Sequence, residues 1–471
     1  MTANPAPSGA ALRVVNPATE EVVAELTRQG KAAADAAVGR AVRAFPAWRD
    51  VTPADRTRML RRFAEQVEGH AEELALLETR NVGKPIADSR GEVAMVADVL
   101  HFYSGAVEKH RGATIPVAGG VDLTWPEPLG VVAAIVPWNF PLAIASWKIA
   151  PALACGNTVV VKPAELTPLT ALRLAELALD AGIPEDVLQV VVGRGTTVGS
   201  ALVEHPNVAK VAFTGSTEAG RDVMARASGT IKRVTLELGG KSANVVFADA
   251  DLELAAASAP FAVFGNAGQD CCARSRILVE QRAFDRFVEL LVAATEALVV
   301  GDPEDGATQM GPLVSADHRA NVSGFVDPVD PVDADEDGLP VAGRSRVPDG
   351  PGFWFPATVL APVEPGRRVW REEIFGPVVA VTPFEDEAHA VALANDTPYG
   401  LSGSIWTRDS SRALRMAKAV QAGVLSVNSN TSVRVNAPFG GMKQSGFGRE
   451  LGLEALASFS EVKNVFLSTE G

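Results

Sequence analysis

Short runs of apolar residues alternate with helical segments through the middle of the chain, and this alternation restricts the fold more than any other feature. The runs are VVAAIV (131–136), TVVVK (158–162), VLQVVVG (187–193), VAKVAFTG (208–215) and RVTLELGG (233–240). Strands that are apolar on both faces are typical of parallel sheets covered by helices on each side. The segment PLTALRLAELALDAG between two of them ends in the glycine expected after a helix. We therefore expect an α/β fold with a Rossmann-like, doubly wound sheet.

A second series of the same kind follows from residue 243, so we place a domain boundary near residue 240. Its strand candidates are SANVVFAD, RILVE, GPVVAVTPFE, GLSGSIWT and GVLSVN, with helices between them. Residues 1–113 and 131–240 would form one domain, and residues 241–430 a second α/β domain. Residues 114–130 resemble an exposed hairpin and residues 452–471 another extended arm, which together predict a small β arm used in oligomerisation.

One acidic segment, DPVDPVDADEDG at residues 327–338, interrupts the second series. Its two prolines are incompatible with a continuous helix, so we expect a solvated, mobile loop there. Because the segment is remote in sequence from the candidate site residues, we expect it to affect local order rather than chemistry.

Charge, hydropathy and cysteine usage argue against several classes of protein. The formal net charge of −14, with no Lys/Arg run longer than a doublet, argues against a nucleic-acid partner. The most apolar stretch, residues 131–147, contains two prolines and an asparagine, so we expect no membrane span. With no signal peptide at the N-terminus, we expect a cytoplasmic protein. Three cysteines without a second Cys or His pair predict neither a disulfide framework nor a metal site.

Two predicted strand ends carry residues suited to a nucleotide. In FTGSTEAG the backbone N–H groups of Gly215, Ser216 and Thr217 would lie at the start of a helix and form an anion site. A plain strand–turn–helix connection without a ligand explains the motif equally well. In VVKPAELTPL, Lys162 and Glu165 follow another strand, at the edge where doubly wound sheets bind ligands. A carboxylate there would accept the ribose hydroxyls of an adenosine and repel a 2′-phosphate; the alternative is a helix-capping glutamate.

Three further positions are candidates for chemistry. Asn139, in VPWNFPL, is either an oxyanion donor or an asparagine that satisfies turn backbone. Glu237 lies at the end of a predicted strand among apolar residues. Desolvation there would raise the pKa of its carboxyl group and make it a general base; the alternative is a salt-bridged glutamate. For the adjacent cysteines in GQDCCARSR, packing, redox and nucleophilic roles stay open. We expect Cys271 near a helix start, which lowers a thiol pKa, and this favours an accessible nucleophile.

Taken together, the motifs resemble those of the hydrolytic, NAD(P)-dependent aldehyde dehydrogenase superfamily, in the family's order and over nearly the whole chain. The motifs are PWNFP (137–141), KPAE (162–165), FTGSTEAG (213–220), ELGGKSA (237–243), GQDCCA (268–273), EEIFGPV (372–378) and PFGGMKQSGFGRELG (438–452). The resemblance implies that residues 1–113 and 131–240 bind NAD and that residues 241–430 are catalytic. Residues 431–451 would then belong to the active site and tunnel.

The resemblance further implies the oxidation of an aldehyde to a carboxylic acid with NAD rather than NADP. Cys271 would attack the carbonyl to give a thiohemiacetal whose oxyanion is held by the Asn139 amide. Hydride transfer to the nicotinamide would leave a thioester, and Glu237 would activate the water that hydrolyses it. Lys148 and Glu450 match positions linked in the family to proton traffic, and the alternative for them is a structural ion pair.

Other matched positions are implied to bind the cofactor or to line the substrate tunnel. The cofactor positions are Val136, Pro137, Trp138, Lys162, Glu165, Gly195, Gly199, Phe213, Gly215, Ser216, Leu238, Glu373 and Phe375. The tunnel positions are Phe140, Trp147, Asp270, Arg434 and Phe439. The aromatic walls suit an apolar or mid-sized aldehyde, whereas Asp270 would attract a cationic substrate and Arg434 an anionic one. The substrate therefore stays open, and we expect a homodimer or homotetramer.

Several other functions compete with this interpretation. A CoA-acylating aldehyde dehydrogenase would pass the thioester to CoA, but that branch usually lacks the glutamate matched by Glu237. A specialised amino-aldehyde or semialdehyde dehydrogenase is a further alternative. A cysteine hydrolase without a redox step, and a non-catalytic binding protein, fit less well because Cys271, Glu237 and Asn139 are all present. Cys272 is hypothesised to protect Cys271 through a vicinal disulfide on oxidation.

Overall fold

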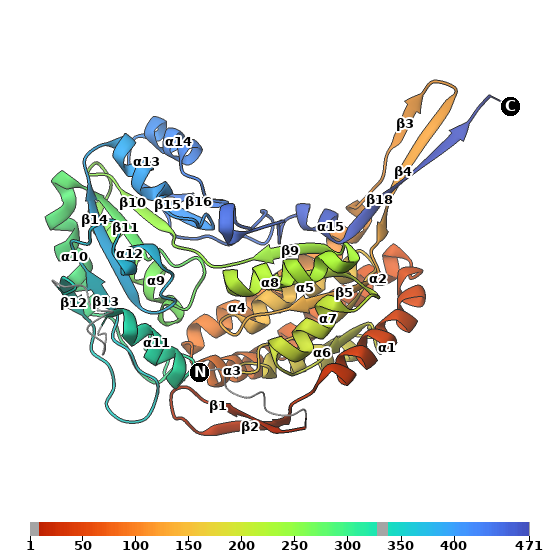
Figure 1. Cartoon of the computed structure of the whole chain (residues 1–471), viewed down its shortest axis with the longest axis horizontal. Coiled ribbons are helices and arrows are strands. Elements are labelled where there is room, and N and C mark those ends of the chain that lie inside the picture. The colour runs from red at the N-terminus through yellow and green to blue at the C-terminus, as the bar shows by residue number, and fades with distance from the viewer. Residues whose placement is uncertain (1–8, 327–337, 471) are drawn as a thin grey trace.

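The computed structural model describes residues 9–326 and 338–470, and it contains two α/β lobes with a narrow β arm projecting from one of them (Figure 1). The α/β fold with Rossmann-like parallel sheets is confirmed. The acidic segment predicted to be a loop lies, apart from its last residue, outside the described residues. No helix in the described ranges is long and apolar enough to cross a membrane.

The first lobe is built on a six-stranded sheet with the order β17-β9-β8-β5-β6-β7. Its strands are β5 (Val131–Ile135), β6 (Thr158–Lys162), β7 (Leu188–Val190), β8 (Val208–Thr214), β9 (Arg233–Glu237) and β17 (Gly446–Phe447). All neighbours are parallel except β17, which runs antiparallel to β9. The chain leaves β5 towards β6 and β7, then returns to the other side of β5 for β8 and β9. The topological switch point, where such sheets bind ligands, therefore lies at the carboxyl ends of β5 and β8.

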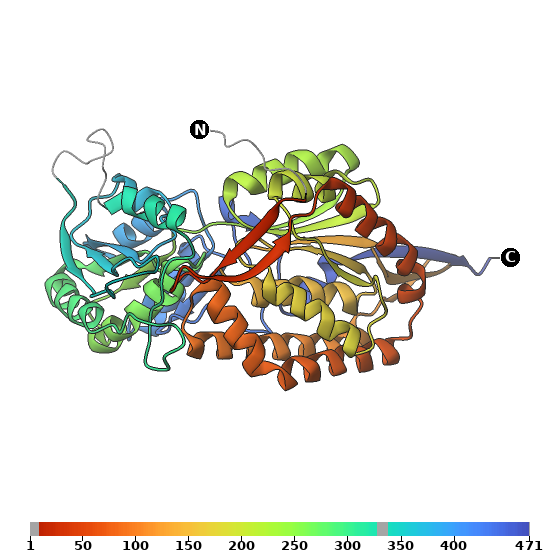
Figure 2. The same cartoon turned by 90° about the horizontal axis from the view of Figure 1, so that it is seen from below.

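Helices cover both faces of this sheet (Figures 1 and 2). They are α1 (Lys31–Arg49), α2 (Pro53–Gly69), α3 (Ala71–Val82), α4 (Ile86–Ala106), α5 (Pro141–Ala154), α6 (Leu169–Asp180), α7 (Ser200–Glu204) and α8 (Thr217–Ala227). Every residue of α5 is buried, because this helix lies between α4 and the sheet. A helix that is apolar on all sides needs such a position.

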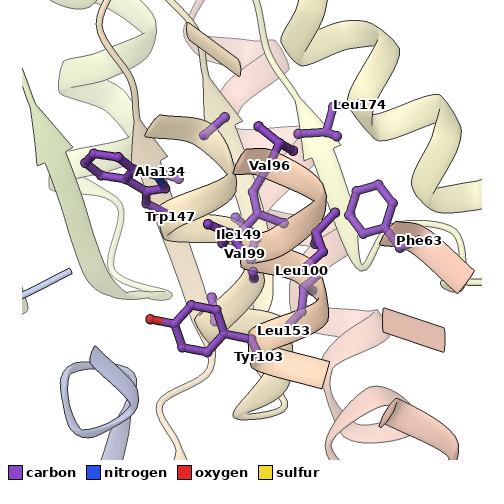
Figure 3. Close-up of a cluster of buried hydrophobic side chains, with 14 of the residues drawn as sticks. Phe63, Val96, Val99, Leu100, Tyr103, Ala134, Trp147, Ile149, Leu153 and Leu174 are labelled. Carbon is purple, nitrogen blue, oxygen red and sulfur yellow. The ribbon is translucent and has the colours of Figure 1, made fainter. Parts of the chain in front are cut away.

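Helices α4 and α5 pack against each other in the core of the first lobe. Figure 3 shows Val99 and Leu100 of α4 packed beside Ile149 and Leu153 of α5. Truncating one of these leucines to alanine would cost about 2–5 kcal/mol of folding free energy. Tyr103, at the end of α4, donates its hydroxyl hydrogen to the Gly452 carbonyl oxygen (2.9 Å) and so anchors the C-terminal segment to this core.

The second lobe has a seven-stranded sheet with the order β12-β13-β14-β11-β10-β15-β16, parallel except for β12 against β13. Its strands are β10 (Ala243–Val246), β11 (Arg276–Glu280), β12 (Val341–Arg344), β13 (Thr358–Leu360), β14 (Val378–Phe384), β15 (Ser402–Trp406) and β16 (Val424–Val427). Its helices are α9 (Leu252–Phe264), α10 (Phe284–Glu296), α11 (Ala316–Val326), α12 (Arg368–Arg371), α13 (Glu387–Asn395) and α14 (Ser410–Ala419). This lobe has its own hydrophobic core. The division into domains near residue 240 stays a prediction.

Two smaller β units complete the fold. The projecting arm is an antiparallel sheet, β18-β4-β3, formed by β3 (Thr114–Val117), β4 (Gly120–Pro128) and β18 (Ser460–Ser468). The N-terminal hairpin, β1 (Ala11–Val15) and β2 (Val22–Thr27), is red in Figure 2. It contacts both lobes, because Phe353 donates its N–H to Pro17 (3.0 Å) and Gln29 donates its N–H to Val192 (2.8 Å). Short helical turns are η1 (Val107–Lys109), η2 (Gly195–Gly199), η3 (Ser228–Thr230), η4 (Gly265–Gly268), η5 (Gln281–Ala283), η6 (Lys443–Ser445) and α15 (Glu454–Ser458).

Candidate active site

Two cavities share the side chains of Thr214, Glu237 and Cys271, and these residues mark the centre of the candidate site. The first cavity has a volume of about 350 Å³ and largely apolar walls from α4, α5, α9 and the segment after β16. The second has a volume of about 430 Å³ and lies at the carboxyl ends of β5, β6, β8 and β9. Two ligands, one in each cavity, would therefore both contact Cys271.

Cys271 lies in a turn between η4 and β11, and no helix begins there, so the expected helix start is wrong. The chain approaches through Asn266 and Ala267, both left-handed with φ of 49° and 55°, and then through Gly268 at φ +70°. A Cβ on Gly268 would lie 2.2 Å from the Gly376 carbonyl oxygen, so only glycine fits. This tight reversal leads the chain straight into the central strand β11 instead of a helix.

The surroundings of the Cys271 sulfur favour the protonated thiol. Its pKa is raised well above the ordinary value by a hydrogen bond with Cys272, by burial and by nearby negative charge, including Asp270. The turn is held by the Asp270 carboxylate, which accepts the Cys272 backbone N–H at 2.8 Å. Cys271 therefore needs a base to become a nucleophile, because no helix dipole ionises it.

The same turn contains a group of metal-ligating atoms that the cysteine spacing did not predict. One ligand atom each from Asp270, Cys271 and Cys272 lies within 4.8 Å of the others. A thiophilic cation bound there would occupy the Cys271 sulfur.

Asn139 is locked to the Cys271 turn by side-chain amides. It lies between β5 and α5, is 4% exposed, and donates from Nδ2 to the Gln269 carbonyl oxygen (2.9 Å). Asn266 Nδ2 donates to the Asn139 carbonyl oxygen (3.0 Å), and Gln269 Nε2 donates to the Asn266 carbonyl oxygen (2.9 Å). An amide nitrogen carries two hydrogens, so a second Asn139 N–H remains for a ligand in the second cavity, which Asn139 lines.

Glu237 ends β9 with its carboxylate buried and without a hydrogen-bond partner in the described part of the chain. Burial first, and the nearby Glu450 second, raise its pKa well above the usual carboxyl value. Gly440 passes so close that a Cβ there would lie 2.7 Å from Glu237 Oε1. The salt-bridged alternative therefore does not apply, and the group has the properties of a general base near neutral pH.

Lys148 and Glu450 form a buried ion pair beside this carboxylate. Lys148 Nζ also donates to Thr214 Oγ1 (2.8 Å), one of the residues shared by both cavities. Glu450 reaches the site from the C-terminal segment, whose backbone pairs Phe439 with Glu450 through hydrogen bonds of 2.7 and 2.8 Å. Glu237 therefore lies next to an ion pair, in which the positive charge is that of Lys148 and the negative charge that of Glu450.

Most of the predicted cofactor residues line the second cavity. They are Val136, Pro137, Trp138, Lys162, Gly195, Phe213, Gly215, Ser216, Leu238, Glu373 and Phe375. Gly199 and Glu165 lie outside the lining: Gly199 packs behind Lys162, and the Glu165 carboxylate accepts a hydrogen bond from Arg28 Nε at 2.6 Å. Arg28 follows β2 and is 137 residues away from Glu165 in the sequence, so no local motif could have predicted this ion pair.

The two ends of the second cavity differ in charge. At one end burial lowers the pKa of Lys162 to about 8. At the other, burial raises the pKa of Glu373 to about 7, although its carboxylate accepts the Gly240 N–H at 2.9 Å. A Cβ on Gly239 would lie 2.1 Å from Glu373 Oε2, so this position of the ELGG motif requires glycine. Phe375 meets Trp138 edge to face at 5.3 Å and closes this end.

The first cavity is lined by Phe140, Trp147, Asp270 and Phe439, as predicted from the resemblance, and Trp147 and Phe439 meet edge to face at 5.2 Å. Arg434 is not part of the lining, so its assignment to the tunnel is wrong. Its side chain is exposed and donates to the Thr431 carbonyl oxygen (3.4 Å). Lining residues that the sequence analysis missed are Met95, Ala143, Ile144, Thr214, Phe261, Ala262, Cys272, Arg274 and Asn430. Two of them had a local signal, since Cys272 lies in GQDCCA and Arg274 directly follows it.

Comparisons with known proteins agree with this geometry. The family model described as "Aldehyde dehydrogenase family" matches residues 5–465. Phenylacetaldehyde dehydrogenase of Pseudomonas fluorescens is 44% identical over 98% of this chain and 94% of its own length. Betaine aldehyde dehydrogenase of Bacillus subtilis (strain 168) is 39% identical over 97% of this chain and 94% of its own. A crystal structure of PnpE in complex with nicotinamide adenine dinucleotide is similar with a TM-score of 0.95 and 43% identity, over 98% of this chain and 95% of that one.

Proposed function

The chain belongs to the aldehyde dehydrogenase family, whose activity is the oxidation of aldehydes to carboxylic acids, and we propose that Cys271 is its nucleophile and NAD its cofactor. One observation carries the assignment of the nucleophile: Cys271 lines both cavities, so a substrate in one and a cofactor in the other would meet at this residue.

The second cavity has the features that a dinucleotide requires. The backbone at Gly215 and Ser216 lies at the start of α8, where N–H groups attract phosphate oxygens. A Cβ on Gly215 would come within 2.6 Å of the Phe213 ring, so the backbone stays bare and open to a close ligand. Lys162 would hold the adenosine end and the Glu373 carboxylate the ribose nearest Cys271. The relative PnpE has been crystallised with NAD, which supports the same cofactor here.

The first half of the reaction forms a covalent intermediate on Cys271. The Cys271 sulfur bonds to the aldehyde carbon, the carbonyl π electrons move to oxygen, and Glu237 takes the thiol proton. The second Asn139 N–H, and the backbone N–H of Cys271, would hold the resulting oxyanion. NAD, when bound in the second cavity, supplies the hydride acceptor that turns this thiohemiacetal into a thioester.

The second half releases the acid by hydrolysis. Glu237 first releases the thiol proton to solvent and then takes a proton from water. The hydroxide adds to the thioester carbon, and the carbon–sulfur bond breaks to release the carboxylic acid and return the Cys271 thiolate. Glu450 and Lys148 stand next to Glu237 and would stabilise or pass on the proton that it gains. A Glu237 free of any salt bridge supports hydrolysis over transfer to CoA.

The walls of the first cavity support an aldehyde with an apolar or aromatic body. Phe140, Trp147 and Phe439 surround the space in front of Cys271, and the relative in Pseudomonas fluorescens is named for phenylacetaldehyde. The test is an NADH-formation screen over aliphatic, aromatic, amino- and carboxy-aldehydes with NAD and with NADP. NADH and free acid in equal amounts support the proposal. Product without NADH would instead indicate a cysteine hydrolase, and acyl-CoA as product would indicate the acylating branch.

The β arm supports a homo-oligomer. The outer strand β18 carries the exposed apolar side chains Val462, Phe466 and Leu467, which favour association of the arm with a second copy, giving a homodimer or homotetramer. Light scattering of the intact protein tests this, since a monomer at assay concentration would contradict it.

The three free cysteines support the cytoplasm as the compartment of this protein. A periplasmic or secreted location found by cell fractionation would contradict that.

A further inference from the structure

A buried arginine lines the substrate tunnel beside the nucleophile. Arg274 is 1% exposed and belongs to the wall of the first cavity, together with Asp270 and Cys271. Its guanidinium donates to Ser404 Oγ (2.9 Å), Ser402 Oγ (2.6 Å), the Cys272 carbonyl oxygen, Ser432 Oγ (2.7 Å) and the Asn430 carbonyl oxygen (3.5 Å). These hydrogen bonds connect the guanidinium group to β15 and to the segment after β16, and they fix its position in the wall of the cavity.

The acceptors around Arg274 are all neutral hydroxyl and carbonyl oxygens. They satisfy the five N–H donors but do not cancel the positive charge, which an arginine keeps at any pH a protein experiences. No carboxylate of the described ranges forms an ion pair with it; Asp270 acts on it only from beyond ion-pair distance. A cation enclosed in this way exerts its field on the tunnel without screening by solvent.

The other ionisable groups that line the tunnel differ from Arg274. Glu450 is paired with Lys148. Glu237 lies where the two cavities join, because it lines both of them. The Asp270 carboxylate accepts the Cys272 backbone N–H at 2.8 Å. Arg274 is the only cationic side chain among the described residues that line the first cavity.

We propose that Arg274 makes the tunnel reject aldehydes that carry a positive charge, so that the enzyme acts on uncharged aldehydes. This inference rests on the proposed function and narrows its substrate class. The aromatic walls by themselves would attract a cation, and the guanidinium opposes that attraction at close range in a poorly solvated space. Anionic groups gain little, because the donors of Arg274 are already engaged. Asp270, expected to attract cationic substrates, is then not the deciding charge.

Two aldehydes of the same shape test the proposal: 3,3-dimethylbutanal and betaine aldehyde differ by carbon in place of quaternary nitrogen. Values of kcat/KM are expressed per free aldehyde, since the cationic group favours the hydrate. The wild type should prefer the neutral aldehyde by about tenfold or more. Arg274→Gln should reduce this preference by about tenfold, whereas Arg274→Lys, which keeps the charge, should retain it. Asp270→Asn should leave the preference equal or greater.

Other results would overturn the proposal. These are equal use of the two aldehydes by the wild type, an unchanged preference in Arg274→Gln, or a preference that responds to Asp270→Asn alone.

If Arg274→Gln does not fold, choline and 3,3-dimethylbutan-1-ol, the matching alcohols, are compared as competitive inhibitors of the wild type and of Arg274→Lys. Tighter inhibition by the neutral alcohol supports the proposal, and equal or tighter inhibition by choline contradicts it. If no aldehyde of any class yields NADH, the proposed function itself has failed; if both isosteres are oxidised equally well, only this inference has.

Discussion

Replacement of Glu237 by glutamine separates the two halves of the proposed reaction. Glutamine keeps the shape of the side chain but cannot take a proton. Because neither carboxylate oxygen of Glu237 has a hydrogen-bond partner in the described residues, the substitution breaks no hydrogen bond, and a loss of activity reflects chemistry. Loss of a general base slows the step it serves by about 10²–10⁴-fold, which corresponds to a barrier increase of roughly 3–5 kcal/mol.

The assay follows NADH during the first turnover in a stopped-flow instrument. If thioester hydrolysis is the step most impaired, Glu237→Gln should show a burst of NADH approaching one per active site, followed by a slow steady state. Intact-protein mass spectrometry should then find the acyl group on the enzyme, and peptide mapping should place it on Cys271. An unchanged steady-state rate, or a slow rate with neither burst nor adduct, would refute the assignment of Glu237 to hydrolysis.

The same variant has a pH signature. Burial raises the pKa of Glu237, so the wild-type hydrolysis rate should rise with pH as this carboxyl ionises, and the variant should lack that rise. A carboxyl whose folded-state pKa is raised contributes stability at pH below its unfolded pKa, and that contribution is lost as the pH rises through the folded pKa. Relative to wild type, Glu237→Gln should therefore gain stability against urea as the pH rises from below the unfolded pKa of the carboxyl through its raised folded-state pKa. A constant difference in stability across pH would contradict the buried, unpaired state of this carboxylate.

The remaining predictions concern other groups of the site. Cys271→Ala should lower turnover to below about a thousandth of wild type while NAD still binds in a fluorescence titration, and Cys272→Ala should remain active; equal losses would contradict the choice of nucleophile. Asn139→Ala should lower kcat/KM by about a hundredfold, from the loss of roughly 3 kcal/mol of oxyanion stabilisation, and a near-normal value in the NADH assay would exclude that role. Lys148→Met leaves its buried carboxylate partner unpaired and should lower the free energy of unfolding in urea by about 3–5 kcal/mol. Because burial lowers the pKa of Lys162 to about 8, the amine loses its charge as the pH rises through that value; NAD affinity should weaken with it, and Lys162→Met should show no such dependence.

The fold could be predicted from local patterns because strand burial is visible in composition. The apolar run at 158–162 coincides with β6, and the run at 131–136 differs from β5 by one residue. The run at 187–193 was too long, since β7 ends at Val190 and the chain leaves the sheet towards η2. The helix expected at Cys271 was wrong because left-handed backbone at Asn266 and Ala267 reverses the chain. Asparagine is enriched in that conformation but alanine is not, so two such residues in succession were not predicted.

The sequence by itself determined the two α/β sheets, the family, and several of the residues that line the cavities around Cys271, because apolar periodicity and ordered motifs are properties of neighbouring residues. Only the tertiary structure decided which charges face which cavity. It pairs Lys148 with a glutamate 302 residues away, ties Glu165 to Arg28 across 137 residues, turns Arg434 to the surface and buries Arg274 in the tunnel wall. Burial and charge pairing arise between segments that folding brings together, and the energy of a charge depends on those surroundings more than on its place in the chain.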